Sequence, residues 1–193
     1  AESVPVEISN GGPLTIASFL REIELLLRDC RRNGDKVQKL LRIIVDSQKS
    51  CIDAFAQYGV GIAMADPVAN PALIGPKLYE KFVFPYTKEL TDYALERTGK
   101  KVSLHMCGAT YSIWKYIEQY QLNEISLDNI VDLDRAAREL GKKVPIAGNI
   151  DPVQSMLNGT KEEIFADVQK CIELGSSAEK GFHLTTGCDI PDG

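Results

Sequence analysis

Two strand-like stretches of the chain end in side chains that bind soft metals. His105 and Cys107 stand two residues apart, and Cys188 follows at the end of a much later stretch. Residues two apart on a strand point to the same face, so the first two side chains lie together. Catalytic zinc takes three protein ligands from His, Cys and carboxylate and keeps a fourth position open. These residues predict a zinc site, and the alternative is that they are packed interior side chains.

The position of Cys188 sets a condition for this site. Cys188 has the same strand parity as the apolar residues Phe182 and Leu184, which are expected to face away from the site. Its thiol reaches His105 and Cys107 only if the chain turns just before it, at residues 186–187.

Four polar residues end other strand-like stretches or open the loops after them, and each is a candidate metal or substrate contact: Asp66, Asp128, Asn149 and Asp151. Of these, Asp66, Asp128 and Asn149 are the candidate catalytic or pocket residues. In a parallel barrel, side chains at the carboxyl ends of the strands gather where substrates bind. Asp66 precedes Pro67, and an Asp-Pro pair also makes a good turn or helix start. Loop formation is therefore the alternative role for these polar residues.

The other cysteines and the second histidine carry less weight. Cys30, Cys51 and Cys171 lie within helical patterns, where a thiol is expected to act as a small buried apolar group. His183 is expected to be a hydrogen-bonded core residue, and a contact to a metal ligand is the alternative.

These candidates lie on an alternation of short strand-like runs with longer helical patterns, which is typical of an α/β protein. The expected strands are residues 14–19, 60–65, 102–106, 124–127, 144–147 and 182–186. The expected helices are residues 35–58, 76–97, 111–120, 133–140 and 161–174. The first of these helices has apolar residues at i, i+3, i+4, i+7 and i+8 spacing.

The third expected strand has the alternation of a parallel barrel. Val102, Leu104 and Met106 would face covering helices, whereas Ser103 and His105 would face the barrel axis. A complete barrel needs eight strands and about 250 residues. With six expected strands, the chain is interpreted as part of a barrel.

Composition sets the broad class. The chain has 193 residues, 44% of them hydrophobic and 25% charged, with a net charge of −5, as in one ordinary globular domain. No apolar run reaches the roughly 20 residues of a spanning helix, and no long Lys/Arg cluster is present, so neither membrane nor nucleic acid is an expected partner. Five cysteines at irregular spacing indicate free thiols and a cytoplasmic location.

Several motifs resemble the uroporphyrinogen decarboxylase superfamily in their order along nearly the whole chain. They are residues 11–18 (GGPLTIAS), 65–67 (ADP), 105–108 (HMCG), 126–128 (SLD), 148–152 (GNIDP) and 186–191 (TGCDIP). Within that superfamily, an H-x-C motif with a distant Cys resembles the zinc-dependent, corrinoid-linked methyltransferase branch.

The resemblance implies a TIM (β/α)8-type barrel in which residues 1–193 form a single domain that supplies the third to eighth strands, as a C-terminal fragment. It implies zinc held by His105, Cys107 and Cys188, with Asp128 as a fourth or exchangeable ligand and with Asp66 and Asn149 in the pocket. The implied reaction moves a methyl group between methylcobalamin, or a corrinoid protein, and a small thiol such as coenzyme M. Such a partial barrel is expected to self-associate as a homo-oligomer or to be poorly stable.

Three other functions remain open from the sequence. One is a decarboxylase that acts on a tetrapyrrole, and a second is a methyltransferase that moves a methyl group from a methoxy or methylamine compound onto a corrinoid protein. The third is a corrinoid-binding module with a structural zinc, which would have four closed ligands.

Overall fold

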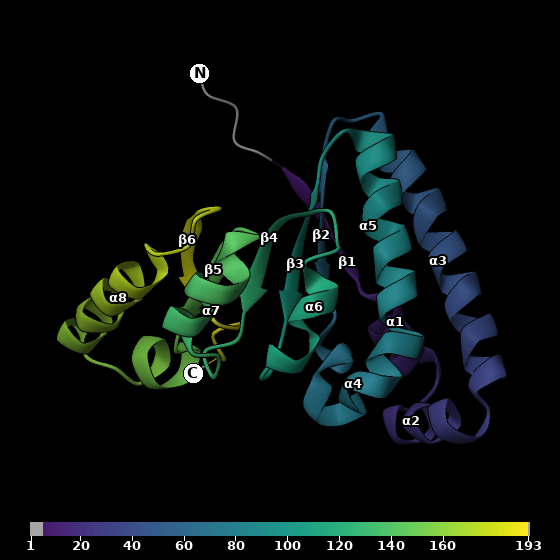
Figure 1. Ribbon diagram of the computed structural model, residues 1–193, viewed down its shortest axis with the longest axis horizontal. Helices are drawn as coiled ribbons and strands as arrows, with labels where there is room; N and C mark the ends of the chain where they lie inside the picture. Colours follow the sequence, from purple (N-terminus) through teal and green to yellow (C-terminus); the bar gives the residue numbers. More distant parts are fainter. Residues whose placement is uncertain (1–5, 193) are drawn as a thin grey trace.

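The computed structural model describes residues 6–192, which contain one six-stranded sheet (Figure 1). All strands are parallel, and their spatial order is their order along the chain. Parallel strands in chain order that are joined by helical segments form the architecture of a TIM (β/α)8-type barrel. This confirms the predicted fold class. The strands are β1 (Glu7–Gly11), β2 (Gly61–Ala65), β3 (Val102–Met106), β4 (Leu122–Leu127), β5 (Ile146–Ile150) and β6 (Phe182–Thr186).

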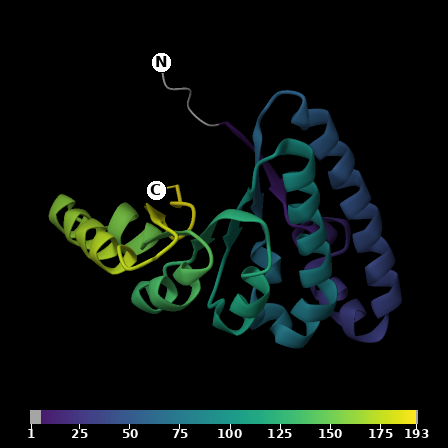
Figure 2. The same cartoon turned by 45° about the horizontal axis from the view of Figure 1, so that its top comes forward.

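Helices cover one face of this sheet. α3 and α5 lie side by side over the first half of the sheet, whereas α7 and α8 pack on its second half, and the turned view agrees (Figure 2). The helices are α1 (Pro13–Leu20), α2 (Ile23–Arg32), α3 (Gly34–Ala56), α4 (Pro71–Phe82), α5 (Phe84–Thr98), α6 (Trp114–Ile117), α7 (Leu133–Glu139) and α8 (Lys161–Gly175). Four short helical turns are η1 (Pro67–Ala69), η2 (Tyr111–Ile113), η3 (Leu140–Lys142) and η4 (Pro152–Leu157).

The expectation of a strand at residues 14–19 is wrong, because this segment lies in helix α1. Pro13 occupies the first turn of that helix, where its missing N–H costs no hydrogen bond. The helix buries Leu14 and Ala17, which are three residues apart. The first strand is β1 instead, a short segment whose weakly apolar sequence gives little strand signal.

Five of the six expected strands are confirmed, with changes at their ends. The helix expected at residues 76–97 is two helices, α4 and α5, separated at Val83. Pro85 in the first turn of α5 cannot donate a backbone hydrogen bond to the preceding turn, which favours a break at this point. Helix α2 is an element not expected from the sequence, and its buried residues Leu26 and Cys30 are four apart.

The alternation of β3 determines which side chains reach the open face. Val102, Leu104 and Met106 are at most 1% exposed beneath the helices, whereas Ser103 and His105 are half-buried on the opposite face. The predicted division of this strand into a helix-facing and an axis-facing side is confirmed. Within the described residues, no helix is long and apolar enough to cross a membrane.

A substitution at Leu104 tests the packing that fixes β3. Leu104→Ala should lower the free energy of unfolding by about 2–5 kcal/mol, because it removes buried methyl groups and leaves a cavity. Ile43→Ala is the matched control, since Ile43 is 67% exposed and should change stability by less than about 0.5 kcal/mol. Urea unfolding measures both values. Equal decreases in the free energy of unfolding for the two variants would contradict the burial of Leu104 in the core.

Candidate metal centre

The imidazole of His105 is held between a hydroxyl group and a thiol. Its strand pairs with β4 so that His105 lies directly opposite Ser126. His105 Nδ1 lies 3.0 Å from Ser126 Oγ, and His105 Nε2 lies 3.3 Å from Cys107 Sγ. Because Nδ1 is engaged by the hydroxyl, Nε2 is the nitrogen that faces the other candidate ligands.

A turn after β6 brings Cys188 to the same place. Gly187 donates a backbone hydrogen bond to Ile150 O at 2.8 Å, and Cys188 Sγ then lies 4.0 Å from Cys107 Sγ. A Cβ on residue 187 would lie 2.3 Å from the backbone nitrogen of Asn129, so only glycine fits this close approach. The turn that the sequence required before Cys188 is present.

The three donor atoms fit a zinc ion. One nitrogen of His105 and the two sulfurs of Cys107 and Cys188 all lie within 4.8 Å of one another. Tetrahedral zinc, with Zn–S distances of about 2.3 Å and Zn–N distances of about 2.0–2.1 Å, places neighbouring ligands about 3.5–3.8 Å apart. A metal ion could therefore be held here with small side-chain movements, and three protein ligands would leave a fourth position open.

Burial favours the neutral forms of two of the candidate ligands, His105 and Cys107. Burial, followed by the neighbouring Cys188, raises the pKa of the Cys107 thiol to about 12. Burial lowers the pKa of His105, partly against the effects of Asp128 and Asp189. A neutral imidazole is ready to bind a metal, whereas the Cys107 thiol must lose a proton on binding.

A cavity of about 510 Å³ opens beside the three ligands on the open face of the sheet. It lies between β3 and the segment that follows β6, so residues far apart in the sequence contribute to one space. Its lining contains Ser9, Ala65, Pro67, His105, Cys107, Ser126, Thr185, Thr186, Cys188 and Asp189.

The structure assigns Asp128 a contact with the loop after β3. Its carboxylate accepts hydrogen bonds from the backbone nitrogens of Gly108 at 2.7 Å and Ile130 at 3.1 Å. Gly108 directly follows the ligand Cys107, so this contact fixes the end of β3 against the end of β4. Among the described residues, the group of close donor atoms contains His105, Cys107 and Cys188 without Asp128. Its role as an exchangeable ligand stays a prediction.

Asp66 is buried away from the lining of this cavity. Its Oδ1 accepts hydrogen bonds from the backbone nitrogen of Thr15 at 3.1 Å and from the Thr15 hydroxyl at 2.6 Å. Thr15 lies in the first turn of α1, so the carboxylate binds the amino terminus of that helix. Its Oδ2 is buried with no hydrogen-bond partner among the described residues, and burial raises the pKa of Asp66 to about 6.

Asn149 connects the end of β5 with the loop after β4. Its Nδ2 donates hydrogen bonds to the carbonyl oxygens of Asp128 at 3.1 Å and Val131 at 2.7 Å. It lines a separate cavity of about 620 Å³ together with Asp151 and Asp167, among others. His183, expected in the core, is exposed, and its Nδ1 lies 3.1 Å from Glu124 Oε2.

Two residues of the site, Ser126 and Asp189, have no role that the sequence indicates. Alternation places Ser126 on the axis-facing side of β4, and the strand register then puts it opposite His105. Asp189 directly follows Cys188 and lines the cavity, and the TGCDIP motif contained it without indicating a role.

The fold and the site together define the class: a parallel α/β protein of TIM-barrel type with a candidate His-Cys-Cys metal centre at the carboxyl ends of its strands. The family described as uroporphyrinogen decarboxylase (URO-D) matches residues 1–193. The chain belongs to this family, which confirms the resemblance in its motifs.

Individual relatives fall into two groups of named activity. The methylcobamide:CoM methyltransferase MtbA of Methanosarcina mazei is 31% identical over 190 residues, covering 98% of this chain and 54% of that protein. The uroporphyrinogen decarboxylase of Pseudoalteromonas atlantica is 26% identical over 199 residues, covering 97% of this chain and 55% of that protein. This chain thus spans about half the length of the curated relatives it matches.

A solved structure has the same fold. A methyltransferase from Methanosarcina mazei superposes with a TM-score of 0.85 at 23% sequence identity, covering 98% of this chain and 54% of that chain. The comparison supports the fold described above, including the parallel order of its strands.

Removing the hydroxyl that holds His105 should weaken metal binding. Ser126→Ala leaves the imidazole free to rotate, and loss of such an orienting contact typically lowers metal affinity by about 10–100-fold. Ser103→Ala is the matched control. Ser103 lies on the same face of β3 as His105, but its hydroxyl donates a hydrogen bond to Glu7 instead of contacting the imidazole. Competition with a zinc-chelating dye measures the affinity, and an unchanged affinity for Ser126→Ala would contradict this role.

The buried carboxyl of Asp66 should make stability depend on pH. Its folded pKa, about 6, lies above the ordinary value of 3.8, so the folded protein binds more protons between these two values. The Asp66 contribution should therefore lower the free energy of unfolding by up to about 3 kcal/mol as the pH rises from 4 to 7.

Asp66→Asn should remove this pH-dependent contribution. The exposed-site variant Asp46→Asn should retain it. Urea unfolding at several pH values measures the difference, and parallel pH profiles for wild type and Asp66→Asn would refute a raised pKa.

Proposed function

We propose that this chain contains the zinc site of a methyltransferase that moves a methyl group between a methylated corrinoid and a small thiol such as coenzyme M. The observation that carries this proposal is the close approach of the donor atoms of His105, Cys107 and Cys188, within 4.8 Å of one another. Relatives named methylcobamide:CoM methyltransferases support the choice of reaction. Because the chain spans about half of their length, we propose that it acts as the later part of a longer barrel.

The chain's own residues would hold the metal and shape the space beside it. His105 Nε2 and the two thiolates are the ligands, and Ser126 fixes the imidazole through Nδ1. A bound zinc ion would make a substrate thiol acidic enough to become a thiolate, which is the nucleophilic form. The cavity beside the ligands gives that thiol a place to bind.

The polar residues around the site are proposed to position it. Asp128 fixes the loop directly after Cys107, and Asn149 binds the carbonyl oxygen of Asp128. Asp66 attaches the end of β2 to the start of α1. These contacts support positioning roles for Asp66, Asp128 and Asn149. For Asp128, the further prediction that it is an exchangeable ligand of the metal is kept.

The lining of the cavity favours the methyltransferase over a decarboxylase. A substrate with several carboxylates would require cationic partners, because a buried charge without a partner is costly. Among the described residues, the lining of the metal-site cavity includes Asp189 but neither Lys nor Arg. A set of three close donors, which would leave a fourth position open, also favours a catalytic over a structural zinc. We propose a corrinoid protein as the partner, self-association as a homo-oligomer and the cytoplasm as the location.

Metal content is the direct test of the site. Protein purified under reducing conditions and reconstituted with zinc should hold about one zinc per chain by mass spectrometry, and Cys107→Ser should lose it. Cys51→Ser is the control, because Cys51, contrary to the expectation that it is buried, is exposed on α3 and lies outside the donor group. Absence of zinc from the reconstituted wild type would refute the proposal.

Folding of the Cys107→Ser variant separates catalytic from structural zinc. Circular dichroism should show a folded variant, whereas transfer of the methyl group from methylcobalamin to coenzyme M should be abolished. Unfolding of Cys107→Ser, with Cys51→Ser intact, would support a structural zinc instead.

A further inference from the structure

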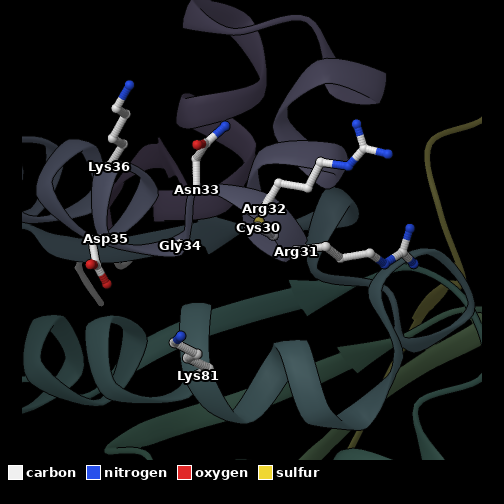
Figure 3. A pocket seen from close by; sticks show the side chains of 8 residues that line it. All are labelled: Cys30, Arg31, Arg32, Asn33, Gly34, Asp35, Lys36 and Lys81. Atoms are coloured by element: carbon white, nitrogen blue, oxygen red, sulfur yellow. The ribbon is translucent and has the colours of Figure 1, made fainter.

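Four cationic side chains gather around a cavity of about 390 Å³ at the junction of α2 and α3 (Figure 3). We call this the basic surface, and it is distinct from the metal-site cavity. Its lining contains Cys30, Arg31, Arg32, Asn33, Gly34, Asp35, Lys36 and Lys81.

The cations of the basic surface lack carboxylate partners. Within residues 6–192, no ion pair forms at Arg31, Arg32, Lys36 or Lys81. Nearby Asp29 is already bound, by Arg21 at 3.0 Å and by Asn33 at 2.9 Å. The lining holds one acidic residue, Asp35, against four cations, so a local excess of positive charge remains on a chain with a net charge of −5.

The start of α3 adds to this excess. α3 begins at Gly34, and a Cβ at that position would lie 3.2 Å from Lys81 Nζ. The amino terminus of a helix carries partial positive charge, which disfavours a nearby cation, and Asp35 in the first turn of α3 offsets part of this charge. A negatively charged partner would reduce the repulsion between Lys81 and the start of α3. It would also reduce the repulsion among the four cationic side chains.

The directions of the side chains favour a broad partner over a single ion. In Figure 3, Arg31 and Arg32 extend to one side, Lys36 points away from them, and Lys81 lies across the gap from Gly34. Charges spread in this way do not converge on one point. They match an acidic protein face, where several carboxylates can pair with separate cations.

The basic surface lies at the end of the molecule that holds the metal site. α2 packs against α4, and α4 contacts η1 and η2, which follow the carboxyl ends of β2 and β3 (Figure 1). His105 and Cys107 lie at that end of β3. A protein that presents a large cofactor to the metal site must approach this end of the sheet.

We propose that the basic surface docks an acidic face of the protein that carries the corrinoid. This inference rests on the proposed function for the identity of the partner. Electrostatic docking of this kind would speed the encounter and orient the carrier, and salt would weaken it.

Labelled poly-L-glutamate of about 20 residues is the probe for an acidic face, and fluorescence anisotropy at low salt measures its binding. Replacing two cations by acids removes attraction and adds repulsion, so the variant Arg31→Glu/Arg32→Glu should bind at least about tenfold more weakly. The matched control is Lys142→Glu/Lys143→Glu, an equal charge change at two exposed residues that precede β5, at the opposite end of the sheet. The control should stay within about twofold of wild type.

Two binding outcomes would overturn the docking surface. Equal losses of affinity for the probe in the two double variants would show that binding depends on the net charge of the protein alone. Saturable binding of inorganic phosphate that displaces the probe at matched ionic strength would identify a small-anion site instead. Selective loss in Arg31→Glu/Arg32→Glu without phosphate competition supports the acidic-face proposal.

Zinc content of the same proteins separates this inference from the proposed function. Arg31→Glu/Arg32→Glu should hold as much zinc as wild type, which shows that its loss of probe binding does not come from a damaged fold. A wild type that binds the probe through this surface but holds no zinc after reconstitution would overturn the corrinoid carrier as the partner.

Discussion

Parallel pairing of β3 with its neighbours is the constraint on which the candidate site depends. It places His105 opposite Ser126 and turns the apolar side chains of β3 under the helices. The same backbone hydrogen bonds that build the sheet therefore set the orientation of a candidate metal ligand. A shift of one residue in this register would turn His105 toward the helices and remove the site.

Loops at the carboxyl ends of the strands are joined by side chains that bind backbone atoms. Asp128 accepts hydrogen bonds from the nitrogen of Gly108, Asn149 donates to the carbonyl of Asp128, and Asp66 binds the start of α1. Each contact crosses from one strand end to another element, so the loops around the metal ligands support one another. Polar residues at strand ends can thus serve the site without touching a substrate.

Charge is distributed unevenly around the same end of the molecule. The metal-site cavity has an acidic residue, Asp189, and no Lys or Arg within its described lining, whereas four cations surround the junction of α2 and α3. Under the proposed function, the metal-site cavity would receive a small thiol and the outer surface an acidic protein. The two surfaces would recognise different parts of one methyl-transfer complex.

Local sequence patterns predict the α/β class, five of the strands and the shared face of His105 and Cys107. These follow from local alternation, which depends only on backbone geometry. Residues 14–19 were misassigned because their apolar content suits a strand or a helix, and only contacts of α1 with the rest of the fold decide between them. Tertiary structure alone decided the approach of Cys188 to Cys107 and the hydrogen bonds of Asp128, since both depend on how separate strands and their loops meet in space.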